Sequence, residues 1–243
     1  QLIKERSELL ERNSEKEYKD WLKKRRPRIS SIGRLLTRRS KDIDLLIGAI
    51  WQSSNLSNKK NLSLFAVGGY GRQQLHPHSD IDLLILYKGN LKEDKVNELE
   101  AFIGKLWDLN LDIGHSVRSI TQEEKIVFSD LQAFTNLLES RFLFGDQNLS
   151  SLPKQILQKK GLWKKEKFLI HKIEEQEIRH HKFDNTEYNL EPNLKSSPGG
   201  LRDIHILDWL LLNYSRDNHK LHDLENILSE AERKELTKSK QWL

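Results

Sequence analysis

Two apolar runs of strand length, separated by a short polar segment, constrain the fold of this chain most. LSLFAV occupies residues 62–67 and IDLLILY occupies residues 81–87. Two adjacent glycines follow the first run, while Asp80 and Asp82 lie at the start of the second. Residues two apart in a strand point to the same face, so the two carboxylates are expected to project together, opposite the intervening apolar residue. The pattern predicts a sheet with a charged site at one end.

The paired carboxylates predict a cation-binding site. Two carboxylates on one face repel each other and are costly to desolvate unless a cation lies between them. The chain contains no cysteine, so a metal would be bound by oxygen or imidazole. Oxygen ligands favour magnesium, with manganese as the alternative, and these ions bind carboxylates together with substrate phosphates. Two such ions can clamp a triphosphate and activate a hydroxyl, which is the two-metal chemistry of nucleotidyl transfer.

The glycine pair, Gly68 and Gly69, supplies the other half of the predicted site. A strand that runs into two glycines and a short helix lets backbone N–H groups approach an anion closely. Arg72 and Ser79 lie between the two strands and can add positive charge and hydrogen bonds. A glycine pair alone would indicate a tight turn, and Asp-x-Asp alone a strand cap. Their combination between two strands favours a nucleotide site.

Helical periodicity surrounds these strands. Before the first strand and after the second, helices are expected over 1–26, 34–52 and 91–110, with a break from Pro27 to Gly33. LDIGHSVRSI at 111–120 predicts a third strand. Farther on, helices are expected over 121–144, 161–183, 200–215 and 223–239. The predicted fold class is α+β, with a small mixed β-sheet core flanked by helices and followed by a helical domain.

Composition narrows the classes of protein to consider. No stretch reaches the roughly 18 consecutive apolar residues of a membrane span, and the first residues form a charged helical pattern rather than a signal peptide, so a cytoplasmic location is expected. The chain lacks methionine, even at its start, which suggests a portion of a longer protein. The net charge of +5 suits a nucleotide ligand and equally a solvated basic face. The basic patches lack interleaved aromatics, so nucleic acid is not expected as a partner.

Three separated motifs resemble one enzyme family. A glycine pair, ten residues and Asp-x-Asp on the next strand resemble the DNA polymerase beta-type nucleotidyltransferase superfamily. More narrowly, GGYGRQQLHPHSDIDLLIL resembles the bacterial PII uridylyltransferases, bifunctional enzymes that uridylylate the nitrogen-regulatory PII protein. LWDLNLDIGHSVRS at 106–119 and YNLEPNLKSSPGGLRDI at 188–204 match the same family in the same order. The last motif is also similar to one in glutamine synthetase adenylyltransferase.

The resemblance implies roles for particular residues. The metal ligands and catalytic carboxylates would be Asp80, Asp82 and Asp112. Asp112 would also deprotonate or orient the attacking tyrosine hydroxyl of PII. The triphosphate of UTP would be bound by Gly68, Gly69, Arg72 and Ser79. In the loop and helix near residue 200, Arg202 would contact phosphate and Asp203 would orient a partner. His115 and Arg118 would face the cleft, although a structural histidine is the more common case.

The resemblance also implies a domain organisation. The expected divisions are N-terminal helices over 1–52, a nucleotidyltransferase α/β core over 53–120, and a helical domain over 121–243 that packs over the nucleotide site. His222-Asp223 resembles a metal-dependent phosphohydrolase signature but has no companion histidine cluster, and it is interpreted as a capped helix start. His180 and His181 are adjacent on a charged helix and cannot easily bind one metal together. The uridylyl-removing and glutamine-sensing ACT domains of the family are expected outside these residues.

Other functions stay open at this level. The base preference cannot be derived from these residues, so an AMP transferase of the glutamine synthetase adenylyltransferase type is one alternative. A nucleotide-sensing domain without turnover is another, although three clustered carboxylates have no use in an idle pocket. A nucleic-acid polymerase or tRNA-modifying relative would share the fold.

Overall fold

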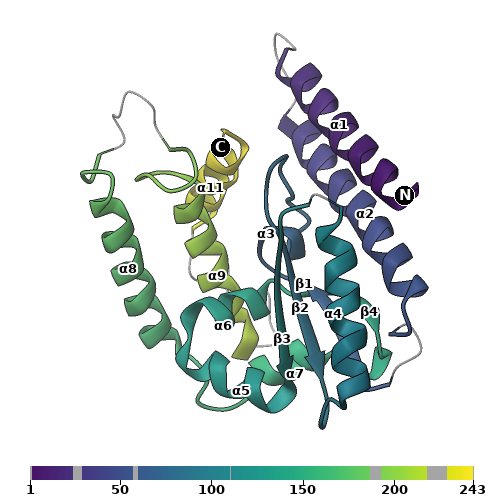
Figure 1. Cartoon of the computed structure of the whole chain (residues 1–243). Helices are drawn as coiled ribbons and strands as arrows, with labels where there is room; N and C mark the ends of the chain where they lie inside the picture. The colour runs from purple at the N-terminus through teal and green to yellow at the C-terminus, as the bar shows by residue number, and fades with distance from the viewer. Residues whose placement is uncertain are drawn as a thin grey trace. The chain divides into compact units, whose positions relative to one another are not determined.

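The computed structural model describes residues 2–23, 29–56, 60–109, 111–186, 193–217 and 229–242 (Figure 1). The chain divides into two compact units. Unit 1 comprises Gln1–Val127 and Glu139–Pro153, and unit 2 comprises Phe128–Leu138 and Lys154–Leu243. The N-terminal helices and a later segment both belong to the unit that contains the sheet, and the functional division predicted at residues 52 and 120 stays a prediction.

Unit 1 is built on a mixed four-stranded sheet. In chain order the strands are β1 Leu62–Ala66, β2 Ile81–Tyr87, β3 Ile113–Ser119 and β4 Arg141–Gly145. Their order in the sheet is β3-β2-β1-β4. β1 is antiparallel to β2 and to β4, whereas β2 and β3 are parallel. The three predicted strands and the α+β class are therefore confirmed.

β4 corrects one prediction. The sequence predicted a single helix over 121–144, but the structure has two helices, α5 Ile120–Ser129 and α6 Leu131–Leu138, followed by β4. The residues of β4 are half-buried and pair with β1, which otherwise would be an edge strand. Backbone pairing with a strand about eighty residues earlier decides this structure, and helical periodicity cannot reveal such a pairing.

Helices α2 Ile29–Ser53 and α4 Glu93–Trp107 pack on one face of the sheet (Figure 1). Helix α1 Leu2–Leu22 packs against α2, the short helix α3 Gly68–Gly71 follows β1, and a 3-10 turn, η1 Gln147–Leu149, follows β4. The predicted break between the first two helices extends too far, to Gly33, since α2 already begins at Ile29. Gly33 has open space around it, so a glycine is tolerated inside this helix at a modest cost.

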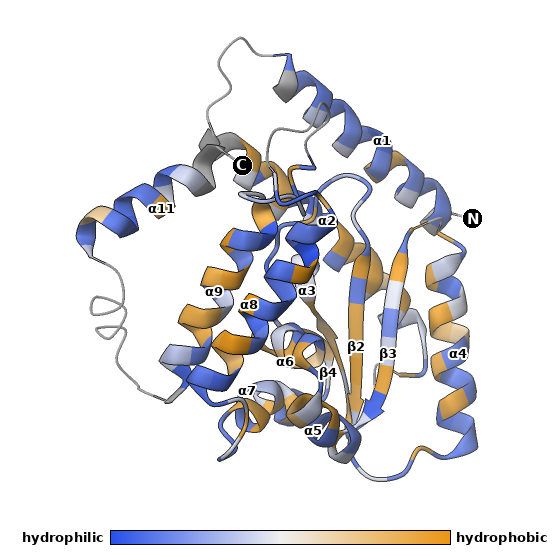
Figure 2. Cartoon of the chain, turned by 90° about the vertical axis from the view of Figure 1, so that its left-hand side faces the viewer, coloured by the Kyte–Doolittle hydropathy of each residue, from blue (hydrophilic) through white to orange (hydrophobic). Residues whose placement is uncertain are grey.

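The core of unit 1 follows the alternation of β2. Ile81, Leu83 and Ile85 are buried in one cluster with apolar residues of α2 and α4. Trp51 of α2 meets Phe102 of α4 edge to face at 5.2 Å within this cluster. Figure 2 shows β2 as apolar along most of its length, which agrees with burial on both faces. Asp82 lies on the face opposite this core, as the period of two predicts.

Unit 2 is helical in the part that the structure describes. Besides α6 it contains α8 Lys165–His181, α9 Leu201–Asp217 and α11 Glu230–Trp242, and α7 Leu152–Leu157 spans the boundary between the units. The ring of Phe134 packs against Phe168 at 5.2 Å and Trp163 at 6.2 Å. The predicted His222-Asp223 helix start lies outside the described residues. No described helix is long and apolar enough to span a bilayer.

Candidate functional site

The carboxylate of Asp82 lies between two glycines. Asp82 pairs in register with Gly114 of β3, and a Cβ atom on that glycine would come within 2.6 Å of Asp82 Oδ1. A Cβ atom on Gly68 would come within 3.1 Å of Asp82 Oδ2. The Asp82 carbonyl also accepts a hydrogen bond from Val67 N at 3.0 Å, which ties the glycine turn to β2. A half-buried carboxylate is thus held in a space that larger neighbours would fill.

The turn after β1 needs glycine for two further reasons. Gly68 has φ +59°, in the left-handed region that other residues rarely adopt. A Cβ atom on Gly71 would lie 2.3 Å from the Glu139 carbonyl oxygen and 3.0 Å from that of Ala66. The turn therefore packs directly against the backbone of the segment that precedes β4.

The other two predicted carboxylates lie at the same end of the sheet. Asp80 and Asp112 directly precede Ile81 and Ile113, which are paired in the parallel β2–β3 ladder. Ile81 N donates to the Asp112 carbonyl at 2.7 Å, and both carboxylate side chains are exposed. The backbone therefore brings Asp80, Asp82 and Asp112 to neighbouring positions, as predicted.

The donor atoms at this end of the sheet are of the chemical kind that binds a metal. Three carboxylates, one in β2 and two directly before β2 and β3, provide the oxygen ligands that hard divalent ions prefer. Within the described ranges, however, no three acidic or histidine side chains are gathered closely enough to form a ready metal site. The predicted ligands are thus suitable in kind and neighbouring in the backbone, but in the described part of the chain their side chains do not converge on one point.

Arg72 is held by a buried partner that the sequence did not reveal. Its guanidinium donates to Glu139 Oε1 at 2.5 Å and to Gln74 Oε1 at 3.0 Å. The Glu139 side chain is only 3% exposed, whereas that of Arg72 is 21% exposed. Ser79 is half-buried, and its N–H donates to the His76 carbonyl in the loop before β2. Arg72 is thus oriented at the turn with part of its surface still open to solvent.

A second network fixes the short helix α3, which begins with the two glycines. Tyr70 is fully buried, and its hydroxyl donates to Asp44 Oδ1 at 2.5 Å. Arg141 of β4 donates to both oxygens of Asp44, at 2.8 and 3.0 Å, and its guanidinium lies 5.3 Å from the Tyr70 ring centre. Burial and the adjacent Asp44 carboxylate raise the pKa of Tyr70 far above its ordinary value. The phenol therefore stays protonated and anchors α3 between α2 and β4.

His115 and Arg118 have structural partners within unit 1. The His115 ring meets the exposed Trp107 ring edge to face at 5.6 Å. Arg118 donates to Glu123 Oε2 at 2.8 Å, and the Glu123 side chain is 1% exposed. These contacts agree with the structural interpretation of the GHSVR motif. The Arg118 side chain is 28% exposed.

In unit 2, Asp203 joins the loop before α9 to α8. It accepts hydrogen bonds from Gln176 at 2.8 Å, from Arg179 at 2.5 Å and from Gly199 N at 2.8 Å, and His180 Nε2 lies 3.1 Å from both carboxylate oxygens. Burial alone would raise the pKa of Asp203, but the hydrogen bonds from Arg179, Gln176 and Gly199 outweigh burial and lower it.

The predicted residues of the PGGLRD motif therefore have different surroundings. Asp203 is a structural acceptor that orients Arg179, whose other nitrogen donates to the Ser196 carbonyl at 2.8 Å. The Arg202 guanidinium lies 5.6 Å from the Trp209 ring centre. Sequence reasoning missed Arg179 and missed His180 as a partner of Asp203. Residues 188–192 of the longer motif at 188–204 lie outside the described residues, and the packing of this loop over a nucleotide stays a prediction.

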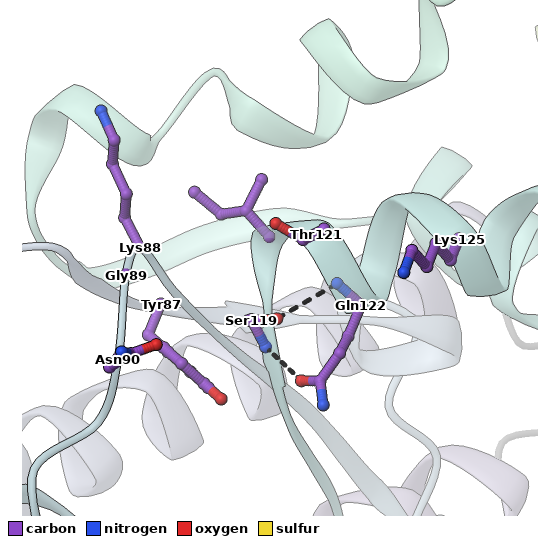
Figure 3. A pocket seen from close by; sticks show the side chains of 9 residues that line it. Tyr87, Lys88, Gly89, Asn90, Ser119, Thr121, Gln122 and Lys125 are labelled. Carbon is purple, nitrogen blue, oxygen red and sulfur yellow. Dashed lines mark hydrogen bonds between the residues drawn. The ribbon is translucent and has the colours of Figure 1, made fainter.

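One pocket of about 590 Å³ lies at the opposite end of β2 and β3 (Figure 3). It is lined by residues that follow the two strands and begin α5: Tyr87, Lys88, Gly89, Asn90, Ser119, Ile120, Thr121, Gln122 and Lys125. Ser119 and Gln122 cap the start of α5 reciprocally, through hydrogen bonds of 2.8 and 3.1 Å. None of the predicted site residues lines this pocket, so it does not belong to the carboxylate site.

Comparisons with known proteins match both units. Residues 50–141 match the model of the nucleotidyltransferase domain family, and residues 167–243 match that of GlnD PII-uridylyltransferase. The chain is 41% identical over 214 residues to the bifunctional uridylyltransferase/uridylyl-removing enzyme of Aliivibrio fischeri strain MJ11, a match covering 88% of this chain and 24% of that protein.

Two further relatives bear the same name. The protein of Vibrio campbellii is 44% identical over 72% of this chain and 20% of its own length. The protein of Pseudomonas fluorescens is 40% identical over 87% of this chain and 24% of its own length. The chain thus spans about a quarter of the length of these curated relatives.

Proposed function

We propose that this chain, which is 40–44% identical over most of its length to bifunctional uridylyltransferase/uridylyl-removing enzymes, transfers UMP from UTP to a tyrosine of the PII protein. The observation that carries the proposal is the Asp82 carboxylate, held between Gly68 and Gly114 at the end of the sheet. This arrangement lies within the region that matches the nucleotidyltransferase domain. The names of the relatives support UTP and PII as substrates.

Asp80, Asp82 and Asp112 would hold the divalent ion or ions that nucleotidyltransferases generally use, and magnesium is the proposed ion. When bound, the metal neutralises phosphate charge and favours ionisation of the attacking hydroxyl. Gly68 and Gly69 present backbone N–H groups at the first turn of α3, where helical N–H groups lack acceptors within the helix. Arg72 and Ser79 add a positive charge and a hydroxyl beside the triphosphate.

The reaction is a displacement at phosphorus. The tyrosine oxygen forms a bond to the α-phosphorus of UTP, while the bond from that phosphorus to the oxygen bridging the α- and β-phosphates breaks. Pyrophosphate leaves with the electron pair of the broken bond, and the hydroxyl proton passes to the carboxylate of Asp112. The product is a UMP–tyrosine phosphodiester. Glu139 keeps Arg72 in place during these steps by accepting its hydrogen bond.

The roles of unit 2 belong to the same proposal. Arg202 would contact phosphate, and Asp203 would act indirectly, because it orients Arg179 and the loop at Gly199. The predicted packing of the helical domain over the nucleotide and the cytoplasmic location likewise stay predictions.

The test is a labelling experiment with each nucleoside triphosphate in turn. The chain is incubated with magnesium, PII and one α-labelled nucleotide, and label on PII is measured. A PII variant whose tyrosines are replaced by phenylalanine is the control for the acceptor. UTP should label PII and leave the control unlabelled. Labelling from ATP in place of UTP would identify an adenylyltransferase, and labelling from none of the nucleotides would contradict the proposed activity.

A further inference from the structure

We propose that the outer edge of β3 binds an extended, tyrosine-bearing segment of the acceptor protein as an added strand. This inference rests on the proposed function, because it concerns how the acceptor hydroxyl reaches the carboxylate site. β3 is the terminal strand of the order β3-β2-β1-β4 and runs for seven residues, Ile113–Ser119. No described strand pairs with its outer side.

The hydrogen-bonding pattern of the parallel ladder fixes which backbone groups face outward. Ile81 N donates to the Asp112 carbonyl, so the backbone groups of the even-numbered residues of β3 are directed toward β2. The N–H and C=O groups of Ile113, His115 and Val117 then point away from β2. Ser119 N is on the same outer side and is already bonded to Gln122 Oε1, which marks the end of the available edge.

The edge also lacks the features that usually prevent strand addition. Exposed edges are commonly protected by proline, by lysine, by inward-pointing charges or by a bulge. The sequence IGHSVRS contains no proline, lysine or carboxylate, and its pairing with β2 continues without a register shift. Its one guanidinium, on Arg118, is paired with buried Glu123. A regular, unprotected edge is therefore presented directly beside Asp112.

Gly114 opens a path from this edge to Asp82. Asp82 and Gly114 are in register, and the Asp82 carboxylate lies over the glycine, 2.6 Å from where a Cβ would be. An added strand would lie about 4.8 Å beyond β3, so its backbone would be about 10 Å from that of β2. A residue opposite Gly114 on the same face points toward this carboxylate with no intervening side chain. A tyrosine crosses most of this distance, whereas a serine does not.

The opposite face of the edge favours an apolar neighbour for that tyrosine. Successive residues of the added strand alternate between faces. On the face of His115, the Trp107 side chain is 56% exposed and meets the His115 ring. A residue next to the tyrosine would point toward this indole. The occupant is therefore an extended segment of the acceptor with tyrosine on the carboxylate face and an apolar side chain beside it.

The matched variants His115→Pro and His115→Ala test this docking. Both remove the ring that meets Trp107, but only proline removes the outward N–H, and proline is tolerated at edge positions that do not donate to the sheet. We expect His115→Pro to raise the KM for PII about tenfold over His115→Ala, as loss of one backbone hydrogen bond and a steric block predict. The KM for UTP should be the same in both. Equal KM values for PII would overturn the docking.

Hydrogen exchange in the unaltered chain provides a second test, which does not depend on the folding of a variant. Adding PII should slow exchange at Ile113, His115 and Val117. Unchanged hydrogen exchange with bound PII would overturn the proposal. Slower exchange at a higher chain concentration without PII would also overturn it, because that result would indicate edge pairing between two copies of the chain. If the unaltered chain labels PII while both tests fail, only the docking is wrong; if it labels no acceptor, the proposed function itself fails.

Discussion

Substituting Gly114 by alanine would test the geometry of the site without removing any of its functional groups. The new Cβ would lie 2.6 Å from Asp82 Oδ1, whereas ordinary van der Waals contact begins at 3.4 Å. The carboxylate must therefore move by about 0.8 Å, or the two strands must separate by a similar amount. Gly114 lies in a regular strand, and its φ is outside the left-handed region, so alanine introduces no backbone strain there.

A displacement of this size is expected to impair transfer severely. A misplacement of about 1 Å in a catalytic constellation can lower the rate about 100-fold. We therefore expect Gly114→Ala to reduce kcat for uridylyl transfer to PII about 30- to 100-fold, with thermal unfolding changed by only a few degrees. Because Asp82 retains its charge in this variant, a lower kcat would show that transfer depends on the position of the Asp82 carboxylate.

The assay compares single-turnover transfer of α-labelled UMP by the unaltered chain and by two variants. Gly104→Ala in α4 is the matched control, since a Cβ at that position meets open space. It should transfer at the unaltered rate and unfold at the same or a slightly higher temperature. Transfer by Gly114→Ala within twofold of the control would refute the claim that Asp82 must occupy the space over Gly114.

Two further predictions concern pH and stability. Tyr70→Phe removes the hydrogen bond to Asp44 and should lower the free energy of unfolding by about 1 kcal/mol. Because the pKa of Tyr70 is raised in the folded state, this difference between the two proteins should be constant below pH 10 and shrink above it. A difference that stays constant in alkaline denaturation would contradict this prediction. Asp203→Asn should cost about 2 kcal/mol at pH 7. Because the pKa of Asp203 is lowered in the folded state, the whole loss of stability should be present above about pH 4 and should decline as the pH falls further. Thermal unfolding at several pH values would measure this loss. A loss that is unchanged at pH 2.5 would show that the charge of Asp203 is unimportant.

The glycine turn and the two carboxylates at the start of β2 were predictable from the sequence because they lie within about fifteen residues of one another. The alternation that places Asp82 on the face opposite the core follows from the period of two in a strand. Strand β3, which begins directly after Asp112, was predictable because its residues form a run of strand length after a helical pattern. Only a resemblance, and no physical signal, singled out Asp112 as the third carboxylate.

The residues that hold the site were not predictable, because their partners are distant in sequence. Glu139 contacts Arg72 from a segment that looked like the end of a helix, and Arg141 reaches Asp44 from a strand that was missed altogether. Pairing of β4 with β1 brings both residues beside the glycine turn. Gly114 gave no signal either, since a single glycine in a strand shows its purpose only when the neighbouring strand is known.

The loop before α9 illustrates a different limit. The resemblance implied that Asp203 orients a partner in the nucleotide site, which stays a prediction, and the structure shows that Asp203 accepts a hydrogen bond from Arg179. The spacing of 24 residues between them spans two helices and a loop, so no helical or strand period connects them. Gly200 is required because a Cβ would lie 2.8 Å from the Leu194 carbonyl oxygen, a clash that only the folded loop reveals.

The central claim is that Asp82 binds the catalytic metal for nucleotidyl transfer, and one measurement tests it most directly. Asp82→Asn preserves the size of the side chain and removes its charge, so the space between Gly68 and Gly114 stays filled. In a single-turnover assay with magnesium, α-labelled UTP and PII, this variant should transfer no detectable UMP while unfolding within a few degrees of the unaltered chain. Transfer at a rate within tenfold of the unaltered chain would contradict the claim.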